Sequence, residues 1–386
     1  MLICCGFGGV GKTTVAASLA LAGARSGLRA CVVTIDPARR LADALGLETL
    51  PNVAHQVPIE LGSEAGRGEL WALMLDPKST FDDLVARYAD SDEQAQRILA
   101  NRLYRNISGA LSGTQEYMAA EKLYELAEEG RFDLLVVDTP PSRNALDFLE
   151  APARLSRFLD NRLFRLVVMP TRAYLRAVSI AAQAFVRTVA KVVGVEVVED
   201  AVAFFQAFEG MEEGFRDRAA RVDELLGGTG TAFVLVASAR KDTVAEAMYF
   251  TSRLSEMGKK PQALVANRLH PRFDRAAAGA GGVPQSPDRD GDERLREEPT
   301  STAPESLTDL AASDRSRAAS LGEETPLGAL YANLAEFRQV AEREEEVLAD
   351  LIARVAPAPV SRVPYLEGDV SDLVGLQQIA AILTSD

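Results

Sequence analysis

The stretch Gly6-Phe7-Gly8-Gly9-Val10-Gly11-Lys12-Thr13-Thr14 sets the interpretation of this chain. It follows a short apolar run at residues 2–5 and leads into an alanine-rich segment with helical spacing, so it joins a predicted β-strand to a predicted α-helix. Glycines let backbone N–H groups converge on phosphate oxygens, and the helix N-terminus adds positive potential at the same point. We therefore predict a phosphate-binding loop (P-loop), against the alternative of a tight glycine turn without a ligand.

The side chains of this loop have separate expected roles. Lys12 is expected to neutralise the β- and γ-phosphates of a nucleotide and to act in catalysis, and the Thr13 hydroxyl is expected to ligate Mg²⁺. The predicted cofactors are therefore ATP and Mg²⁺. The other predicted nucleotide contacts in the loop are Gly8, Gly9, Val10, Gly11 and Thr14.

Two aspartates follow predicted strands further along the chain. Asp36 closes the run that contains Thr34, and Asp138 closes the run at residues 134–137. Ligands of doubly wound sheets bind at the carboxyl ends of the strands, so both carboxylates are expected beside the phosphates. Asp36 would orient the attacking water or accept its proton, and Asp138 would hold Mg²⁺ through a water molecule. Either aspartate alone could instead be a helix N-cap.

Strand-like apolar runs alternate with helical patterns over the first third of the chain and return further on. This alternation predicts an α/β fold with a doubly wound, mainly parallel sheet. Residues 1–274 are predicted to form the P-loop core, with an inserted helical subdomain at about 81–130 and 144–226. The predicted strands are residues 2–5, 30–35, 70–75, 134–137, 232–237 and 263–266, and predicted helices begin at Lys12 and near Leu41.

The last third of the chain changes composition twice. Residues 275–324 are rich in Ala, Gly, Pro, Ser and charged residues and have almost no large apolar side chain, which predicts a disordered linker. Residues 325–386 are predicted to complete the nucleotide domain with a helix over 327–355, a strand near 360–363 and a closing helix from Val370.

Composition excludes several classes of protein. A formal net charge of -14 argues against a general nucleic-acid binder. No apolar run reaches the roughly 18 residues that a membrane-spanning helix needs, and the N-terminus does not have the pattern of a secretory signal. Cys4, Cys5 and Cys31 lack the spacing of a zinc or redox site and are predicted to be buried thiols. We expect a cytoplasmic protein, with a peripheral position at the membrane as an alternative.

The P-loop and the two aspartate motifs, in this order, resemble the ArsA-type anion-transporting ATPase family. That family includes arsenite-pump ATPases and the ATPase that targets tail-anchored membrane proteins, and the similarity to MinD is more distant. The resemblance implies a P-loop NTPase of the deviant Walker A (MinD/ArsA-like) type. Three stretches are similar to actinobacterial ArsA-like ATPases: Thr34-Ile35-Asp36-Pro37-Ala38-Arg39-Arg40-Leu41, Gly113-Thr114-Gln115-Glu116-Tyr117, and Asp138-Thr139-Pro140-Pro141-Ser142-Arg143-Asn144-Ala145-Leu146.

The same resemblance implies contacts to the nucleoside. Asn267, after the predicted strand at 263–266, resembles the asparagine that reads adenine, and Pro364 lies in a loop similar to the one that flanks the base. On sequence alone, Asn267 could equally be a turn residue at a strand end.

Phe7 departs from the family pattern, because the family carries at this position a second lysine that reaches the partner's phosphates across a dimer. Cations stabilise the charge on the transferring phosphoryl group, so a homodimer of this chain would lose one in each site. A heterodimer with a paralogous subunit that carries the lysine would avoid the deficit. Alternatively, Arg39, Arg40 or Arg143 supplies the charge.

The function predicted from these features is Mg²⁺-dependent ATP binding and hydrolysis that drives a dimer between open and closed states. The helical insertions would couple this switch to a client, either an apolar helix of a protein or a membrane protein. Two alternatives differ in class. The chain could be a catalytically weak regulatory ATP-binding subunit of a heterodimer, or a metabolic P-loop kinase or ligase.

Overall fold

The computed structural model describes residues 1–36, 40–59, 68–102, 104, 114–140, 142–160, 194, 196, 200, 203–204, 207, 211–273, 306–368, 370 and 372–385. The predicted helical insertions at about 81–130 and 144–226 lie partly outside these residues, and so does the stretch at 275–305 of the predicted linker.

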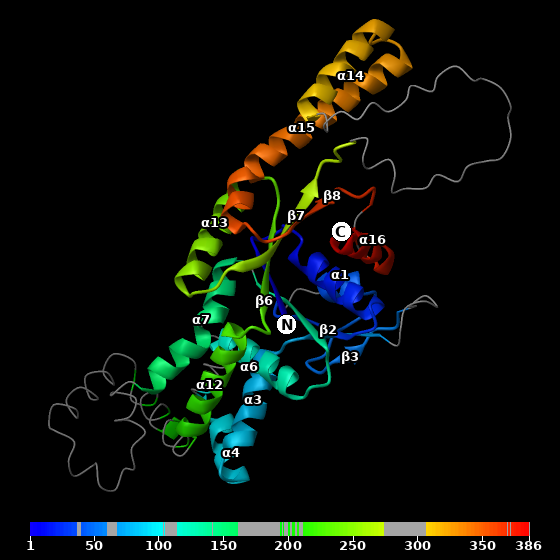
Figure 1. The fold of residues 1–386 in the computed structure, drawn as a ribbon. Helices are drawn as coiled ribbons and strands as arrows, with labels where there is room; N and C mark the ends of the chain where they lie inside the picture. Colours follow the sequence, from blue (N-terminus) through cyan, green and yellow to red (C-terminus); the bar gives the residue numbers. More distant parts are fainter. Residues whose placement is uncertain are drawn as a thin grey trace.

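A twisted sheet of eight strands, built from the described residues, forms the centre of the molecule (Figure 1). Its order is β3-β4-β2-β5-β1-β6-β7-β8, and every neighbouring pair is parallel except β3 with β4. The predicted α/β class with a mainly parallel sheet is therefore confirmed. The strands are β1 (Leu2–Gly6), β2 (Arg29–Thr34), β3 (His55–Gln56), β4 (Glu69–Met74), β5 (Leu134–Asp138), β6 (Ala232–Ala237), β7 (Pro261–Leu269) and β8 (Val360–Pro364).

Helices cover both faces of this sheet, and each face has its own apolar core. Cys4 packs in the core beneath α1, α2 and α16, whereas Cys5 packs in the core beneath α7, α13 and α15, as expected for neighbouring residues of a strand. The helices named here are α1 (Lys12–Arg25), α2 (Arg40–Ala44), α7 (Ser142–Leu159), α13 (Lys241–Glu256), α15 (Pro326–Val355) and α16 (Leu373–Thr384).

The strand β3 was not predicted from the sequence. It has only two residues, His55 and Gln56, both exposed and paired antiparallel to β4 at the edge of the sheet. Two residues are too few to show the alternation of apolar and polar positions by which a strand is recognised.

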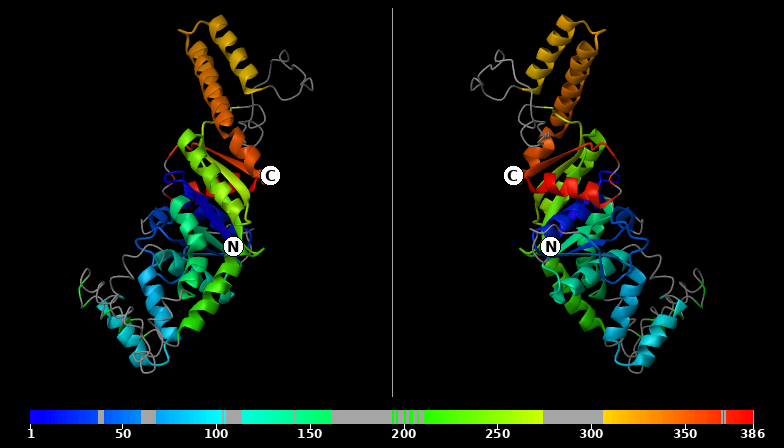
Figure 2. Two further views of the ribbon diagram at one scale, coloured as in Figure 1. Left: turned by 90° about the vertical axis from the view of Figure 1, so that its left-hand side faces the viewer. Right: turned by 90° about the vertical axis from the view of Figure 1, so that its right-hand side faces the viewer.

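A helical layer extends the molecule beyond the sheet (Figure 2). Its core is aromatic: Phe81 packs against Tyr104 with 5.1 Å between ring centroids, and Tyr88 packs against Phe215 at 5.5 Å. Phe81 and Tyr104 both belong to the first predicted insertion, whereas Tyr88 and Phe215 come from different insertions, so the second pair ties the two predicted insertions together. The layer comprises α3 (Pro77–Tyr88), α4 (Asp92–Ala100), α6 (Thr114–Glu128) and α12 (Glu212–Gly227).

The predicted linker needs a correction at its C-terminal end, because α14 (Leu307–Leu321) lies within residues 275–324. This helix packs along α15 and forms with it a hairpin that projects from the sheet (Figures 1 and 2). Ser306 caps the helix by accepting from the Asp309 N–H at 3.1 Å. Its buried stripe consists of two leucines, two alanines and Asp314, which forms a buried ion pair with Arg338. Because the stripe has so few large apolar residues, the sequence of α14 resembles that of a disordered segment. Its packing against α15 is visible only in the structure.

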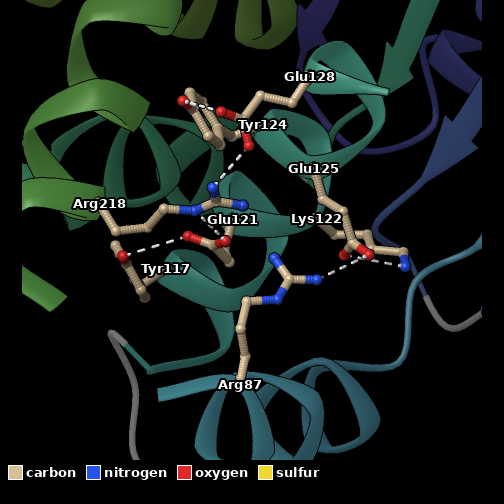
Figure 3. Close-up of polar contacts among 8 residues, drawn as sticks. All are labelled: Arg87, Tyr117, Glu121, Lys122, Tyr124, Glu125, Glu128 and Arg218. Carbon is tan, nitrogen blue, oxygen red and sulfur yellow. Dashed lines mark hydrogen bonds and ion pairs between the residues drawn. The ribbon is translucent and has the colours of Figure 1, made fainter. Parts of the chain in front are cut away.

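An ion-pair cluster joins α6 to α12 (Figure 3). The Arg218 guanidinium is 4% exposed; its Nε donates to Glu121 Oε1 at 2.6 Å and its Nη1 to Glu128 Oε2 at 2.7 Å. The same group lies 4.2 Å from the Tyr124 ring centroid. Tyr117 donates its hydroxyl to Glu121 Oε2 at 3.3 Å. Burial raises the pKa of Glu121, and the charge of Arg218 opposes this shift.

We predict that Glu121→Ala lowers the free energy of unfolding by about 3–5 kcal/mol, because it leaves the Arg218 guanidinium buried without its main counter-charge. The measurement is urea-induced unfolding followed by circular dichroism. Arg87→Ala is the matched control, since Arg87 is exposed and pairs with Glu125 at 3.4 Å; its loss is expected to cost about 1 kcal/mol or less. Equal costs for the two variants would contradict the role given to the buried pair.

Candidate functional site

The loop between β1 and α1 takes its shape from three glycines. Gly9 and Gly11 have φ of 82° and 92°, in the left-handed region that side chains with a Cβ avoid. At Gly6 an added Cβ would lie 2.3 Å from the Val236 carbonyl oxygen on the neighbouring strand β6. Gly11 also begins the helix, since the Val15 N–H donates to its carbonyl at 2.9 Å. The backbone of this loop thus has the tight turn and helix N-terminus expected of a phosphate site.

Lys12 folds back along the same loop. Its side chain is mostly buried, and Nζ donates to the Phe7 carbonyl oxygen at 3.0 Å. Burial lowers the pKa of Lys12, and the nearby charges of Asp138 and Asp36 oppose that shift. The ammonium group is therefore held within the loop and faces the two predicted carboxylates.

Asp138 lies at the carboxyl end of β5 and is 1% exposed. Thr34 donates its hydroxyl to Asp138 Oδ2 at 3.0 Å. Burial raises the pKa of Asp138 to about 6, while a hydrogen bond from Thr13 and the charge of Lys12 oppose the rise. The other oxygen, Oδ1, is buried and has no hydrogen-bond partner among the described residues.

These groups fit a hydrated Mg²⁺. The ion takes oxygen ligands and keeps several of its waters, so it needs a hydroxyl such as Thr13 and a carboxylate oxygen free to accept from a bound water. Asp138 Oδ1 is such an oxygen, beside Thr13. The described residues contain no group of three or more His, Cys, Asp or Glu side chains that could bind a metal ion by themselves. A metal held here would therefore depend on phosphate and water for its remaining ligands.

Asp36 follows β2 and is brought next to Asp138 by the register of the sheet. Thr34 pairs with Asp138 across β2 and β5, and the Asp36 N–H donates to the Thr34 hydroxyl oxygen at 3.3 Å. One threonine thus links the backbone of Asp36, the predicted catalytic aspartate, to the carboxylate of Asp138, the predicted metal-binding one. The Asp36 side chain is 27% exposed and lies 4.0 Å from the Arg40 guanidinium.

Of the three arginines considered as sources of positive charge, Arg40 is the one that the described structure places, beside Asp36. Arg39 and the side chain of Arg143 lie outside the described residues.

Asn267 is brought to the P-loop by β7. Its side chain is 6% exposed, and Nδ2 donates to the Val10 carbonyl at 2.8 Å. A Cβ at Gly11 would lie 2.3 Å from this Nδ2, so the close approach requires glycine there. Pro364 lies further along, where its Cα pairs with that of Leu269. It lines a cavity of about 270 Å³ at the ends of β7 and β8, together with Leu269, His270, Pro271, Arg272, Phe273, Ala341, Glu344, Glu345 and Arg362.

Sequence reasoning missed Arg268. Its Nη1 donates to the Gly9 carbonyl at 2.7 Å, and its backbone has φ of 61°. In the sequence, the only indication of a role for Arg268 was its position directly after Asn267. That position does not show that the side chain reaches the P-loop, because this depends on where β7 lies in the sheet.

Phe7 lines a cavity of about 790 Å³ between α7 and α13. Its walls carry both signs of charge, and Glu150 pairs there with Arg154 at 2.8 Å and with Arg253 at 3.0 Å. The other lining residues are Leu146, Asp147, Asp242, Ala245, Glu246 and Tyr249. The side chain of a lysine in place of Phe7 would therefore lie next to acidic side chains of this cavity.

Residues 1–278 match the model of a protein family described as "Anion-transporting ATPase". Similar proteins include an uncharacterized protein of Streptomyces coelicolor, 31% identical over 282 residues (73% of this chain and 65% of that protein). The ATPase get3 of Aspergillus terreus is 29% identical over 159 residues (40% and 43%), and the ATPase GET3 of Malassezia globosa is 30% identical over 162 residues (41% and 44%). The matched segments thus span less than two thirds of the length of these relatives.

We predict that Asp138→Asn raises the free energy of unfolding of the nucleotide-free protein by about 1–3 kcal/mol at pH 7.5 and by less at pH 4.5. The folded-state pKa of about 6 exceeds the ordinary value of 3.8. The native state therefore binds this proton more tightly than the unfolded state, and the resulting stability, present below pH 4, is lost as the pH rises through 6.

Urea unfolding at the two pH values checks this prediction. Asp83→Asn, an exposed change on α3, is the control and should have no effect at either pH. A variant at Asp138 that is less stable than the parent at pH 7.5 would show that the buried carboxylate is not a source of destabilisation.

Proposed function

Because this chain belongs to the anion-transporting ATPase family, we propose that it binds MgATP at the loop of residues 6–14 and hydrolyses the terminal phosphate bond. The observation that carries the proposal is the convergence of Lys12, Thr13 and Asp138 at the carboxyl edge of the sheet. These three groups lie at or just after the ends of two neighbouring strands, and one buried oxygen of Asp138 accepts no hydrogen bond from any described residue. They match the requirements of a nucleoside triphosphate and its metal.

Each group of the site has a defined task in this proposal. Lys12 exchanges its bond to the Phe7 carbonyl for the β- and γ-phosphate oxygens. Asp138 would accept from a water bound to the metal, and the Thr13 hydroxyl would be a direct ligand. Mg²⁺ supplies charge neutralisation to the phosphates when bound. The backbone N–H groups of Gly8, Gly9, Val10, Gly11 and Thr14 complete the phosphate contacts.

Asp36 orients the water that attacks the γ-phosphate, or accepts its proton. Its support is its place just after β2, the strand that pairs with the strand of Asp138, with its backbone N–H bonded to the shared Thr34 hydroxyl. Its side chain is partly exposed and open to bulk water, whereas Asp138 is buried.

The order of the strands in the sheet indicates how the nucleotide is oriented across the site. Asp36 and Asp138 follow β2 and β5, on one side of β1, whereas Asn267 and Pro364 lie on β7 and β8, on the other. With the phosphates over the loop after β1, the terminal phosphate faces the aspartates and the nucleoside extends toward Asn267 and Pro364. This arrangement supports the assignment of those two residues to the adenine side.

The hydrolysis cycle opens and closes a dimer and moves the helical layer. Support comes from α7, which begins four residues after Asp138 and packs against both α6 and α12. A change at the γ-phosphate therefore reaches the helical layer directly. The client in this proposal is an apolar helix of a protein or a membrane protein. None of the helices in the described ranges combines the length and apolar character of a membrane span. The cytoplasmic location stays a prediction.

A second candidate function follows from Phe7. With no lysine at this position the chain could act as a slow, ATP-binding regulatory subunit, paired with a paralogue that carries the lysine. Both versions place ATP in the same site and differ in the rate of the lone chain.

We predict that Lys12→Ala abolishes MgATP binding, because it removes the charge that neutralises the phosphates. Asp36→Asn should keep binding but lower turnover about 100-fold or more, because it removes the group that orients water. Binding is followed with a fluorescent ATP analogue and turnover by phosphate release. Asp43→Asn, an exposed change on the neighbouring α2, is the control. Retained turnover in the Asp36 variant would remove that residue from its assigned task.

Phe7→Lys is expected to raise the turnover of the lone chain about tenfold, because it restores a cation to the transferring phosphoryl group. Phe7→Met, which keeps an apolar side chain against the cavity, should leave turnover unchanged. Phosphate release measured over a range of protein concentrations checks both variants and detects any dependence on dimer formation. An unchanged rate with lysine at position 7 would mean that the missing cation does not limit the reaction.

A further inference from the structure

Two successive residues of β7 hold two successive carbonyls of the P-loop. Arg268 Nη1 donates to the Gly9 carbonyl at 2.7 Å, and Asn267 Nδ2 donates to the Val10 carbonyl at 2.8 Å. In both hydrogen bonds the donor and the acceptor are more than 250 positions apart along the chain. Strand β7 is separated from β1 by β6, so the side chains of Asn267 and Arg268 reach across the end of an intervening strand.

The direction of these carbonyls determines the direction of the loop's donors. In a planar trans peptide, the C=O of one residue and the N–H of the next point in opposite directions. Fixing the Gly9 and Val10 carbonyls toward β7 therefore turns the N–H groups of Val10 and Gly11 away from β7. We infer that Arg268, together with Asn267, is a positioning residue that orients these N–H groups for phosphate before the nucleotide arrives.

The backbone at Arg268 is deformed to make this contact. Its φ of 61° is unfavourable for a residue with a Cβ, and the register of β7 against β8 shifts between Asn267 and Leu269. The Arg268 N–H donates to Asn267 Oδ1 at 3.0 Å, which fixes the turn. Glycine would adopt this conformation without strain. The hydrogen bond from its side chain to the Gly9 carbonyl explains why an arginine occupies this position.

Arg268 also brings a positive charge to the loop. Its guanidinium bonds the Gly9 carbonyl, as the Lys12 ammonium bonds that of Phe7. A hydrogen bond from a charged donor is stronger than one from a neutral amide. Preorganised N–H groups cost no reorientation when phosphate binds. This inference rests on the ATP site proposed above and adds a residue on the nucleoside side of it.

The test uses the full chain with Arg268→Gly. This variant removes the guanidinium and at the same time relieves the backbone strain. The affinities for MgATP and MgADP should fall together, each about tenfold, as expected for the loss of one charged hydrogen bond that acts on the β-phosphate contacts. The thermal midpoint of the nucleotide-free protein should stay the same or rise. Arg268→Lys, which can still donate to Gly9, should recover part of the affinity.

Controls separate this inference from the proposal it rests on. Arg25→Gln removes an equal charge from the exposed far end of α1 and should leave both affinities unchanged. If the parent chain fails to bind MgATP more tightly than Lys12→Ala, the ATP site and the role of Arg268 fall together. If the parent binds and Arg268→Gly binds equally well, only the inference fails. A fall in thermal midpoint that accounts for the lost affinity would also overturn it, because the residue would then be structural. A fall in MgATP affinity alone would place Arg268 at the γ-phosphate and contradict it.

Discussion

The buried carboxylate of Asp138 is the constraint on which the site depends. It lies at the end of an interior strand, next to Lys12 and Thr13; Thr34 donates to one of its oxygens, and the other has no partner within the part of the chain that the structure describes. A buried charge without full hydrogen bonding is costly, and Thr34, Thr13 and Lys12 offset only part of that cost. The parallel pairing of β5 with both β1 and β2 leaves the residue no other position. The position of the P-loop and the proximity of Asp36 follow from the same pairing.

Strand β7 is the second determinant of the site. Asp36 and Asp138 lie at the ends of strands that were recognisable as buried apolar runs, but on the other side of β1 the loop is contacted at a strand end by polar residues. Asn267 contacts the loop through Val10 and restricts position 11 to glycine. The P-loop therefore lies between the Asp138 carboxylate on one side and the Asn267 amide and Arg268 guanidinium on the other.

The sequence predicted the features that repeat along the chain or follow a spacing rule. The apolar runs of β1, β2, β5 and β6 and the glycines of the loop are of this kind. Arg268 could not be predicted, because its task depends on a neighbour more than 250 residues away and on an unusual φ. The helix α14 was missed because its buried stripe has only two large apolar residues and because Arg338, the partner of its buried Asp314, belongs to another helix. The two-residue strand β3 has too little pattern to be recognised.

The helix α7 has a mechanical consequence. It has 18 residues and is therefore about 27 Å long. Its first turn lies next to the site, and its length runs along α6 and α12. A tilt of about 10° around that first turn would move the far end by about 5 Å, which is a full helical turn's rise, although the atoms near the phosphate would move by a small fraction of that distance. With this geometry the helix would act as a lever arm: a shift the size of a hydrogen bond at its first turn would become a displacement the size of a side chain at its far end.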